Sequence, residues 1–220
     1  MNRSQREYMF GLFLDIFFPR HCMMCKKSGV LLCPSCVQKL PHAEKNQISY
    51  CSSLYNYKSP TVKKIILYLK KNKSKELAMI LGKLLSDIST DISSEYATLH
   101  QTHITILVPI PISRVRLLER GFNQSKLIAQ SLLQNVSQHD YVVQELLQRA
   151  SHRKKQSTVT SRQDRMKNMK NVFIAKKILS KDSLYIIIDD VTSTGATLQE
   201  AKRALQKAGA RHIVGITVAH

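Results

Sequence analysis

Residues 185–201, YIIIDDVTSTGATLQEA, constrain the fold of this chain more than any other stretch. Four apolar residues without alternation, Tyr185 to Ile188, are typical of a central parallel strand that is buried on both faces. Two acids follow, then a hydroxyl-rich turn that contains Gly195, and a helical pattern begins near Ala196. A strand, a tight turn and a helix in this order predict part of a mostly parallel sheet.

The rest of the chain continues the alternation of strands and helices. Strand patterns cover residues 48–57, 104–112, 141–149, 183–190 and 211–220, and helical patterns cover residues 59–88 (with a break near Asn72), 113–134 and 195–210, the last capped by Gly209. These patterns predict an α/β fold with a doubly wound, mostly parallel sheet. Residues 150–171 are charged and weakly periodic, so we expect a long basic loop there.

Two Cys-x-x-Cys pairs in CMMCKKSGVLLCPSC are separated by seven residues: Cys22, Cys25, Cys33 and Cys36. Each pair can bind a metal from a tight turn, and two pairs complete a closed, structural Zn²⁺ site. Two disulfides are an alternative that a cytosolic compartment disfavours. A redox dithiol is a second alternative, which the doubled pattern disfavours.

The residues around these pairs support a small metal-binding knuckle. Gly29 and Pro34 supply turn residues. His21 is an alternative ligand, with a surface role as the simpler expectation. Cys51 has no partner in sequence and is expected to be a small core residue.

We expect residues 1–45 to form an apolar helix, the knuckle and a linker, and residues 46–220 to form the larger domain. Residues 8–18 imitate a signal peptide, but they contain Asp15, lack a small-residue cleavage site and are shorter than about 18 residues. They predict a helix that is buried or faces a partner, and the knuckle either braces it or offers a docking surface. No other segment approaches a membrane span, so a cytoplasmic location is expected.

The charge balance predicts contact with polyanions. The chain has 34 Lys and Arg against 15 Asp and Glu, a net charge of +19, beyond the roughly 2–8 charges that solubility requires. A lysine–tyrosine strip suited to single-stranded nucleic acid comprises Lys63, Lys64, Lys70, Lys71 and Lys73 with Tyr55, Tyr57 and Tyr68. The alternative is a solvated helix face.

Asp189 and Asp190 end the apolar strand at 183–190, where α/β sheets bind their ligands. Carboxylates suit a sugar diol or a hydrated Mg²⁺. The helix N-terminus after them suits a phosphate, assigned to Val191, Thr192, Ser193, Thr194, Gly195, Ala196 and Thr197. A ribose 5-phosphate would join the two sub-sites. The alternative, a mere N-cap and strand end, leaves the desolvation cost of paired acids without compensation.

Several motifs together resemble the ComF/GntX family, type I phosphoribosyltransferase-like proteins that carry an N-terminal zinc knuckle and are linked to natural competence. The resemblance covers nearly the whole chain through FLDIFFPRHCMMC, LLCPSC, VPIPISRVRLLERGFNQS, RMKNMKNVF and IIIDDVTSTGATLQEAKRALQKAGA, in this order. RGFNQ together with the two acids is its specific part.

This resemblance implies that the ligand is phosphoribosyl pyrophosphate (PRPP), bound with Mg²⁺. It assigns the ribose hydroxyls and catalysis to Asp189 and Asp190, with Arg165 as a further catalytic residue, and the pyrophosphate side to Arg114, Arg116 and Arg120. Residues 153–168 would be a mobile loop that closes over the substrate. The family places a Gln eight residues before the Arg of its R–N pair, whereas Gln156 lies nine before Arg165, which pairs with Asn168. With Cys51 as the one further cysteine, a second metal site is not expected.

Three functions follow as expectations. The first is a ComF-type competence protein that binds PRPP in its pocket and single-stranded DNA on its basic surface, and so helps internalised DNA during transformation. Its candidate partners are a helicase and an inner-membrane DNA channel. The second is a phosphoribosyltransferase that acts on an unidentified acceptor. The third is a PRPP-sensing regulator, although nothing in the sequence resembles a helix-turn-helix.

Overall fold

The computed structural model describes residues 20–44, 48–102, 104–137, 140–150 and 172–220. It separates into two compact units, residues 1–40 and 41–220, whereas the expected boundary followed residue 45. In the second unit, Ala43 N–H donates to the Leu54 carbonyl of strand β1 (Cys51–Tyr55), so the segment expected to be a linker pairs with a strand. The expected N-terminal helix lies outside the described residues.

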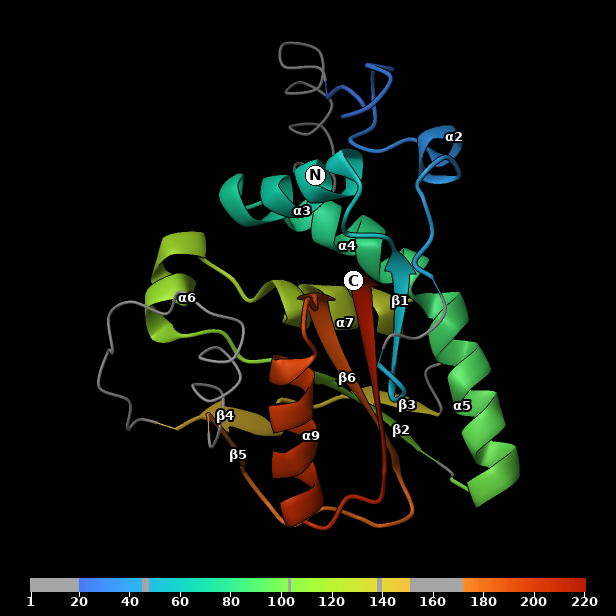
Figure 1. The fold of residues 1–220 in the computed structure, drawn as a ribbon, viewed down its shortest axis with the longest axis vertical. Coiled ribbons are helices and arrows are strands. Elements are labelled where there is room, and N and C mark those ends of the chain that lie inside the picture. The colour runs from blue at the N-terminus through green and yellow to red at the C-terminus, as the bar shows by residue number, and fades with distance from the viewer. Residues whose placement is uncertain (1–19, 45–47, 103, 138–139, 151–171) are drawn as a thin grey trace, which may run out of the picture. The chain divides into compact units, whose positions relative to one another are not determined.

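A five-stranded, all-parallel sheet forms the centre of the second unit, in the order β1-β7-β6-β2-β3 (Figure 1). Its other strands are β2 (Thr105–Pro109), β3 (Tyr141–Val143), β6 (Leu184–Val191) and β7 (His212–Ala219). Strand order reverses between β2 and β6, since the chain continues outward to β3 on one side and to β7 on the other. The α/β fold with a mostly parallel sheet is therefore confirmed.

The central strand β6 is buried because neighbours cover its edges and both its faces. Residues from Leu184 to Ile188 are at most 1% exposed. Tyr185 and Ile187 belong to a core cluster with Leu198 and Leu205 of helix α9 (Ala196–Lys207). Because successive side chains of a strand point to opposite faces of the sheet, Leu184, Ile186 and Ile188 lie on the other face. The absence of polar alternation in this strand is thus explained by its place in the sheet.

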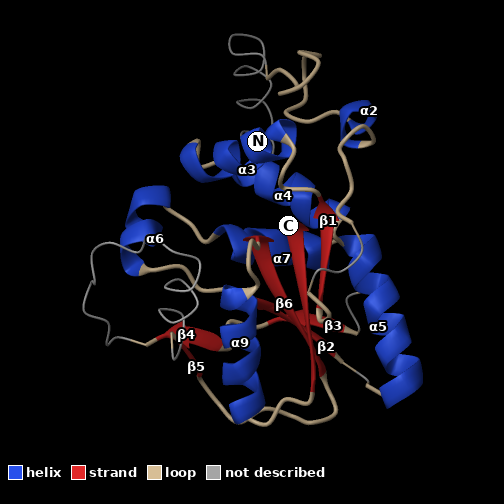
Figure 2. Ribbon diagram, viewed as in Figure 1, coloured by secondary structure: helices blue, strands red, loops and turns tan. Residues whose placement is uncertain are grey.

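Six further helices are described. They are α2 (Pro34–Val37), α3 (Pro60–Lys71), α4 (Lys75–Leu84), α5 (Ser86–His100), α6 (Arg114–Arg120) and α7 (Gln124–Leu133). The predicted helical stretch 59–88 is three helices, because Asn72 ends α3 and Leu85 joins α4 to α5. In Figure 2, α5 and α9 stand beside the central sheet as separate helices.

The expected strand at 141–149 is wrong as one element. β3 ends at Val143, and Leu146 N–H donates to the Gln144 carbonyl in a turn. Residues Leu147–Arg149 then form β4, which pairs antiparallel with β5 (Phe173–Ala175) in a separate two-stranded sheet. The polar pair at 144–145 interrupts the apolar run, so the chain turns out of the main sheet there. The predicted basic loop between β4 and β5 falls on residues 151–171, outside the described residues.

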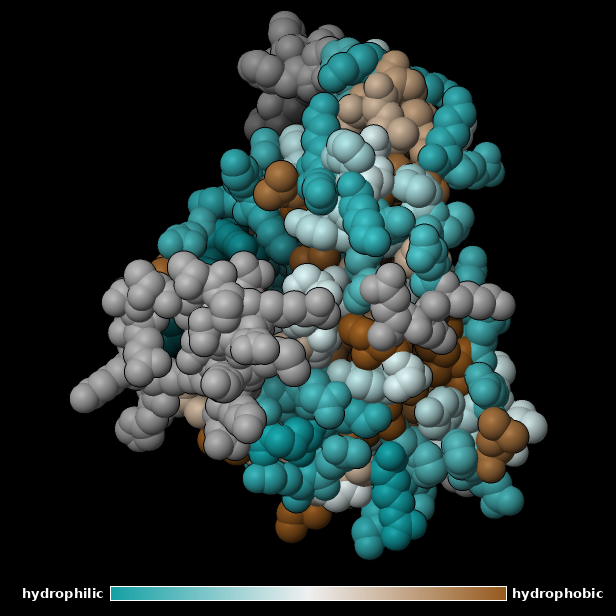
Figure 3. Space-filling model, in the orientation of Figure 1, coloured by the Kyte–Doolittle hydropathy of each residue, from teal (hydrophilic) through white to brown (hydrophobic). Residues whose placement is uncertain are grey.

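The surface in Figure 3 is mostly hydrophilic, with small apolar groups scattered over it. In the parts of the chain that the structure describes, no helix has the length and apolarity to cross a membrane.

Candidate functional site

A pocket opens where the carboxyl ends of β2 and β6 meet, at the point where strand order reverses. Ile110 N–H, just after β2, donates to the Ile188 carbonyl over 3.0 Å, so the loop after β2 runs beside the end of β6. The pocket has a volume of about 420 Å³ and is lined by both acids, by Thr197 at the start of α9 and by basic residues of other elements. Such a switch point is where α/β sheets bind ligands.

Asp189 accepts two hydrogen bonds at the same oxygen. The Ser125 hydroxyl donates to Oδ1 over 3.0 Å, and the Asp190 N–H donates to it over 2.9 Å. Burial, and then the charge of Asp190, nevertheless raise the pKa of Asp189 to about 7. The two adjacent acids therefore resist carrying two full charges, and a cation or the hydroxyl donors of a ligand would relieve that cost.

Asp190 is 7% exposed and forms an ion pair with a lysine from outside the predicted site. Its Oδ2 lies 3.2 Å from Nζ of Lys70, the next-to-last residue of α3. The sequence pattern alone predicts Lys70 as a member of the lysine–tyrosine strip. The structure places it in the pocket, because the end of α3 reaches the carboxyl end of β6.

The turn at 191–197 is held by its own hydroxyls. Gly195 N–H donates to Thr192 Oγ1 over 3.1 Å, and Ala196 N–H donates to Thr194 Oγ1 over 3.4 Å. Gly195 has φ +73°, a left-handed conformation that favours glycine. A Cβ there would also lie 2.7 Å from Ile48 Cδ1, so the end of that side chain would have to shift. Ser193 is exposed, and Val191 and Thr197 line the pocket. A preformed turn at a helix N-terminus suits an anion.

The RGFNQ motif builds the opposite wall. Arg120, the last residue of α6, donates from Nη1 to Gln124 Oε1 over 3.1 Å. Asn123 caps α7 by accepting from Ser125 N–H, and its Nδ2 donates to the Ile110 carbonyl over 2.9 Å. The bond to Ile110 attaches the start of α7 to the loop after β2. Ser125 is thereby brought to Asp189.

The donors on this wall suit a phosphate-bearing ligand. Arg116, Arg120 and Arg149 line the pocket, whereas Arg114 begins α6 outside the lining. Gln124 is 1% exposed, and its Nε2 has no hydrogen-bond partner among the described residues. This amide can therefore donate to a ligand oxygen or to an ordered water in the pocket. Arg165, Gln156 and Asn168 lie outside the described residues.

Several polar residues of the pocket were missed or misassigned from the sequence, among them Ser125, Gln124, Arg149 and Lys70. Ser125 and Gln124 are inside the quoted motif VPIPISRVRLLERGFNQS, which could have signalled them, but no pattern gives the direction of their side chains. Lys70 carried no signal beyond its charge, because its role depends on how α3 packs.

The remaining lysines of the strip are on the surface. Lys63, Lys64, Lys71 and Lys73 are exposed, and Lys63 Nζ lies 6.0 Å from the centroid of the Tyr57 ring. Tyr57 and Tyr68 are half-buried, and Tyr55 is 3% exposed. Tyr55 therefore belongs to the core and cannot stack on a base, which corrects that part of the strip.

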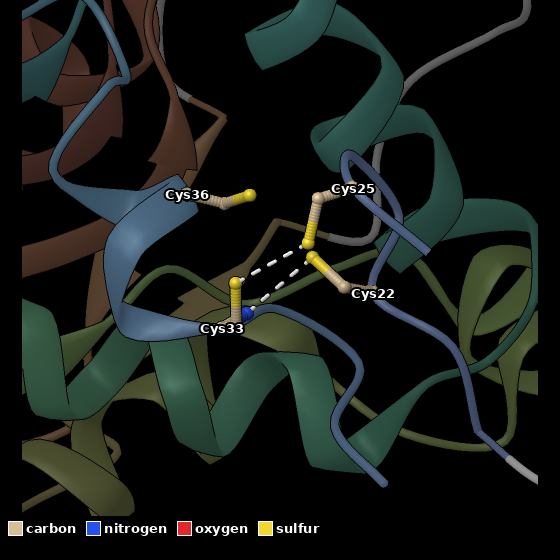
Figure 4. Close-up of side chains that lie close together, drawn as sticks. All are labelled: Cys22, Cys25, Cys33 and Cys36. Carbon is tan, nitrogen blue, oxygen red and sulfur yellow. Dashed lines mark hydrogen bonds between the residues drawn. The ribbon is translucent and has the colours of Figure 1, made fainter. Parts of the chain in front are cut away.

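The first unit gathers its four cysteines at one place (Figure 4). Their sulfur atoms all lie within 4.8 Å of one another. A turn closed by Lys26 N–H to the Cys22 carbonyl carries the first pair, and the start of α2 carries the second. As expected, Gly29 adopts a positive φ of 87° and Pro34 begins α2. His21 is exposed and pairs with Ser28, outside this group.

The protonation of these thiols suits a metal. Burial disfavours the Cys22 thiolate, but N–H groups around it, the largest effect being that of Cys25, bring its pKa down to about 6. The hydrogen bond with Cys33, and then burial, raise the pKa of Cys36 to about 12. The group thus contains both thiolate and thiol. A divalent metal that bound to all four sulfur atoms would displace the remaining thiol protons. The four cysteines could hold a metal such as zinc. Cys51 is buried in the core of the second unit, as expected.

Comparison with known proteins agrees with this architecture. Residues 115–220 match the model of the phosphoribosyl transferase domain. The chain is 33% identical over 128 residues to Competence protein ComFC of Bacillus subtilis (strain 168), a match that covers 58% of this chain and 49% of that protein. It is 30% identical over 111 residues to Competence protein F of Haemophilus influenzae, covering 49% of this chain and 46% of that protein.

The chain thus spans about half the length of the curated relatives that it matches. The matched residues include α6 from its second residue, α7 and both acids of β6, so the similarity coincides with much of the pocket. The cysteine group is the N-terminal feature that the resemblance leads us to expect. Residues 115–220 are therefore similar to a phosphoribosyl transferase domain, and about half of the chain is similar to two competence proteins, ComFC and F.

Proposed function

We propose that the pocket binds PRPP, with ribose 5-phosphate as its minimal ligand. The observation that carries the proposal is the arrangement of two crowded acids between a hydroxyl-rich helix N-terminus and an arginine-lined wall. Asp189 and Asp190 accept hydrogen bonds from the ribose hydroxyls. The turn at 192–197 binds the 5-phosphate, and Arg116, Arg120 and Gln124 Nε2 donate to the pyrophosphate.

Mg²⁺ fits the same site, because burial, and then the charge of Asp190, raise the pKa of Asp189, and a bound cation would favour its charged form. Asp189 and Asp190 are the carboxylates that could hold it, and when bound it would neutralise diphosphate charge. Phosphoribosyl transfer to an unidentified acceptor is the reaction this arrangement supports. The basic groups would stabilise the departing pyrophosphate without a covalent nucleophile.

Calorimetric titration with PRPP and Mg²⁺ tests the site. Asp189→Asn combined with Asp190→Asn should reduce affinity by about 100-fold or more, since two charge-assisted contacts are lost. Asp182→Asn is the matched control, because Asp182 is an exposed acid outside the lining. Unchanged binding by the double variant would exclude the ribose-phosphate site. Pyrophosphate release with bases or single-stranded DNA then tests for turnover.

We also propose that the protein acts in natural competence by binding incoming single-stranded DNA. Both relatives are named as competence proteins, which supports the process. The net charge of +19 together with four exposed lysines supports the ligand. Lys63, Lys64, Lys71 and Lys73 would neutralise phosphates, and Tyr57 and Tyr68 remain the aromatic side chains for stacking. A helicase or an inner-membrane DNA channel would be the protein partner, and the cytoplasm the location.

Binding of a thymidine oligonucleotide, measured by fluorescence anisotropy at several salt concentrations, tests this role. Replacing the four exposed lysines by Gln should weaken binding and lower the salt slope by about 0.7 for each lost phosphate contact. A variant with Lys176, Lys177, Lys181 and Lys207 replaced by Gln loses the same four charges from exposed positions remote from α3 in sequence, and is the control for net charge. An equal loss in both variants would show that charge alone, and not the strip, attracts DNA.

A further inference from the structure

Lys70 differs from every other lysine of α3. Its ammonium lies 3.2 Å from Asp190, and its side chain is 25% exposed, whereas Lys63, Lys64 and Lys71 are exposed. Val62, Ile66 and Leu69 bury the apolar side of α3. The ion pair places the end of the helix beside the end of β6. Lys70 is thus the lysine of α3 whose positive charge lies in the pocket.

The partner of Lys70 is also a residue that the ligand must use. Asp190 is an acceptor, and the hydroxyls of a ribose would donate to the same carboxylate. A lysine ammonium presents three donors and a compact charge on a flexible stem, so it can exchange a carboxylate for a phosphate without a change in the backbone. Arg116 and Arg120 line the same pocket and would bind the same phosphate groups.

We infer that Lys70 is a ligand-binding residue, which neutralises Asp190 in the empty pocket and transfers to the phosphate oxygens when the ribose hydroxyls engage Asp190. The inference rests on the proposed function, because it requires a ligand that joins a diol to phosphate groups. It assigns a specificity role to a residue outside the matched domain at 115–220. It also removes Lys70 from the DNA-binding strip.

Lys70→Met and Lys71→Met test this inference as a matched pair, because the two lysines are adjacent and only Lys70 faces the pocket. Calorimetry with PRPP and Mg²⁺ should show a loss of about 10- to 100-fold for Lys70→Met, the range expected for a hydrogen bond to a charged group. Lys71→Met should leave PRPP binding unchanged. Anisotropy with the thymidine oligonucleotide should show the reverse order. Lys70→Arg should retain most of the PRPP affinity.

Unchanged or tighter PRPP binding by Lys70→Met would overturn the inference. Tighter binding would mean that Lys70 only competes with the ligand for Asp190, and unchanged binding would mean that Lys70 does not contact the ligand. A loss of DNA binding equal to that of Lys71→Met would overturn it as well. If the wild-type protein bound no PRPP, both the proposed function and this inference would be wrong. That outcome is distinct from the other two, in which the wild-type protein binds PRPP. Lys70→Gln, which keeps a donor for Asp190, carries the test if Lys70→Met does not fold.

Discussion

Ser125 donates a hydrogen bond of 3.0 Å to Asp189 across 64 residues of sequence, joining the first turn of α7 to the end of β6. Ser125 is 2% exposed, so this bond is formed away from bulk water. It connects the RGFNQ motif to the two acids, the two sequence features that most specifically resemble the family. The pocket is therefore one structural unit and not two neighbouring motifs.

Ser125→Ala should weaken PRPP binding by about 2- to 10-fold at neutral pH. The variant removes a donor that favours the charged form of Asp189, so the pKa of this carboxyl should rise further above its usual range. Calorimetry between pH 6 and 8 measures the effect, and the loss should be smaller at the higher pH. Ser131→Ala is the control on the same helix, because Ser131 donates to the Met79 carbonyl far from the acids. Equal losses in both variants would contradict the role of Ser125.

The pKa of Asp189 also predicts how stability depends on pH. Its ordinary value is 3.8 and its value in the folded protein is about 7, so between these values the folded state binds more protons than the unfolded state. Stability from this group is therefore present at low pH and is lost as pH rises from about 4 to about 7. Asp189→Asn should remove this loss and raise the melting temperature at pH 8 by a few degrees, about 2–4 °C per kcal/mol. Thermal unfolding at pH 5 and pH 8 measures it, and Asp182→Asn should show no such difference.

The sheet could be predicted because its strands are buried on both faces and carry continuous apolar runs. Tyr185–Ile188 and Thr105–Pro109 are examples. The acids and the turn after β6 could be located for the same reason, since they follow such a run directly. The break at Gln144 could not be predicted, because residues 141–149 read as a strand and only the pairing of β4 with β5 decides otherwise.

The pocket could be predicted only where one continuous segment builds it. Asp189 to Thr197 is such a segment, whereas Lys70 arrives from a helix more than 100 residues earlier in the chain. Its charge placed it among surface lysines, and its ion pair with Asp190 and its place in the pocket lining distinguish it from Lys71. Tyr55 was misassigned for a related reason, because a tyrosine beside lysines looks the same in sequence whether exposed or buried.

Gly82→Ala should destabilise the protein by roughly 1–3 kcal/mol, the usual cost of overpacking. A Cβ at Gly82 would lie 2.6 Å from Ser131 Cβ and in contact with the Ile128 carbonyl, so α4 and α7 would have to separate. Urea unfolding measures the change. Lys83→Ala, on the exposed side of the same helix, should change stability by less than about 0.5 kcal/mol. A neutral Gly82→Ala would show that the two helices can move apart freely.

Glu200 of α9 forms a hydrogen bond with Val172, the residue directly before β5. Its Oε1 accepts from Val172 N–H over 3.0 Å, and Arg203 donates to both of its oxygens over 2.7 and 2.8 Å. Glu200→Ala should increase hydrogen exchange at the Val172 amide by at least tenfold, because a buried donor loses its partner at a cost of about 1–3 kcal/mol. Glu200→Gln keeps an acceptor and should change exchange less. Equal exchange in Glu200→Ala and the wild type would mean that α9 does not anchor this segment.

The cysteine group predicts one bound zinc per chain. The sulfur atoms of the four cysteines already lie within 4.8 Å of one another, and the pKa of Cys22 is lowered to about 6, so part of the thiolate charge that Zn²⁺ requires is present near neutral pH. Cys22→Ser with Cys25→Ser should abolish metal retention in elemental analysis and lower the resistance of residues 1–40 to proteolysis. Cys51→Ala should retain the metal, because Cys51 lies in the core of the other unit. Loss of zinc in the double variant with unchanged PRPP binding would assign the metal to folding of the first unit. A wild-type protein that contains no zinc in elemental analysis would contradict the site.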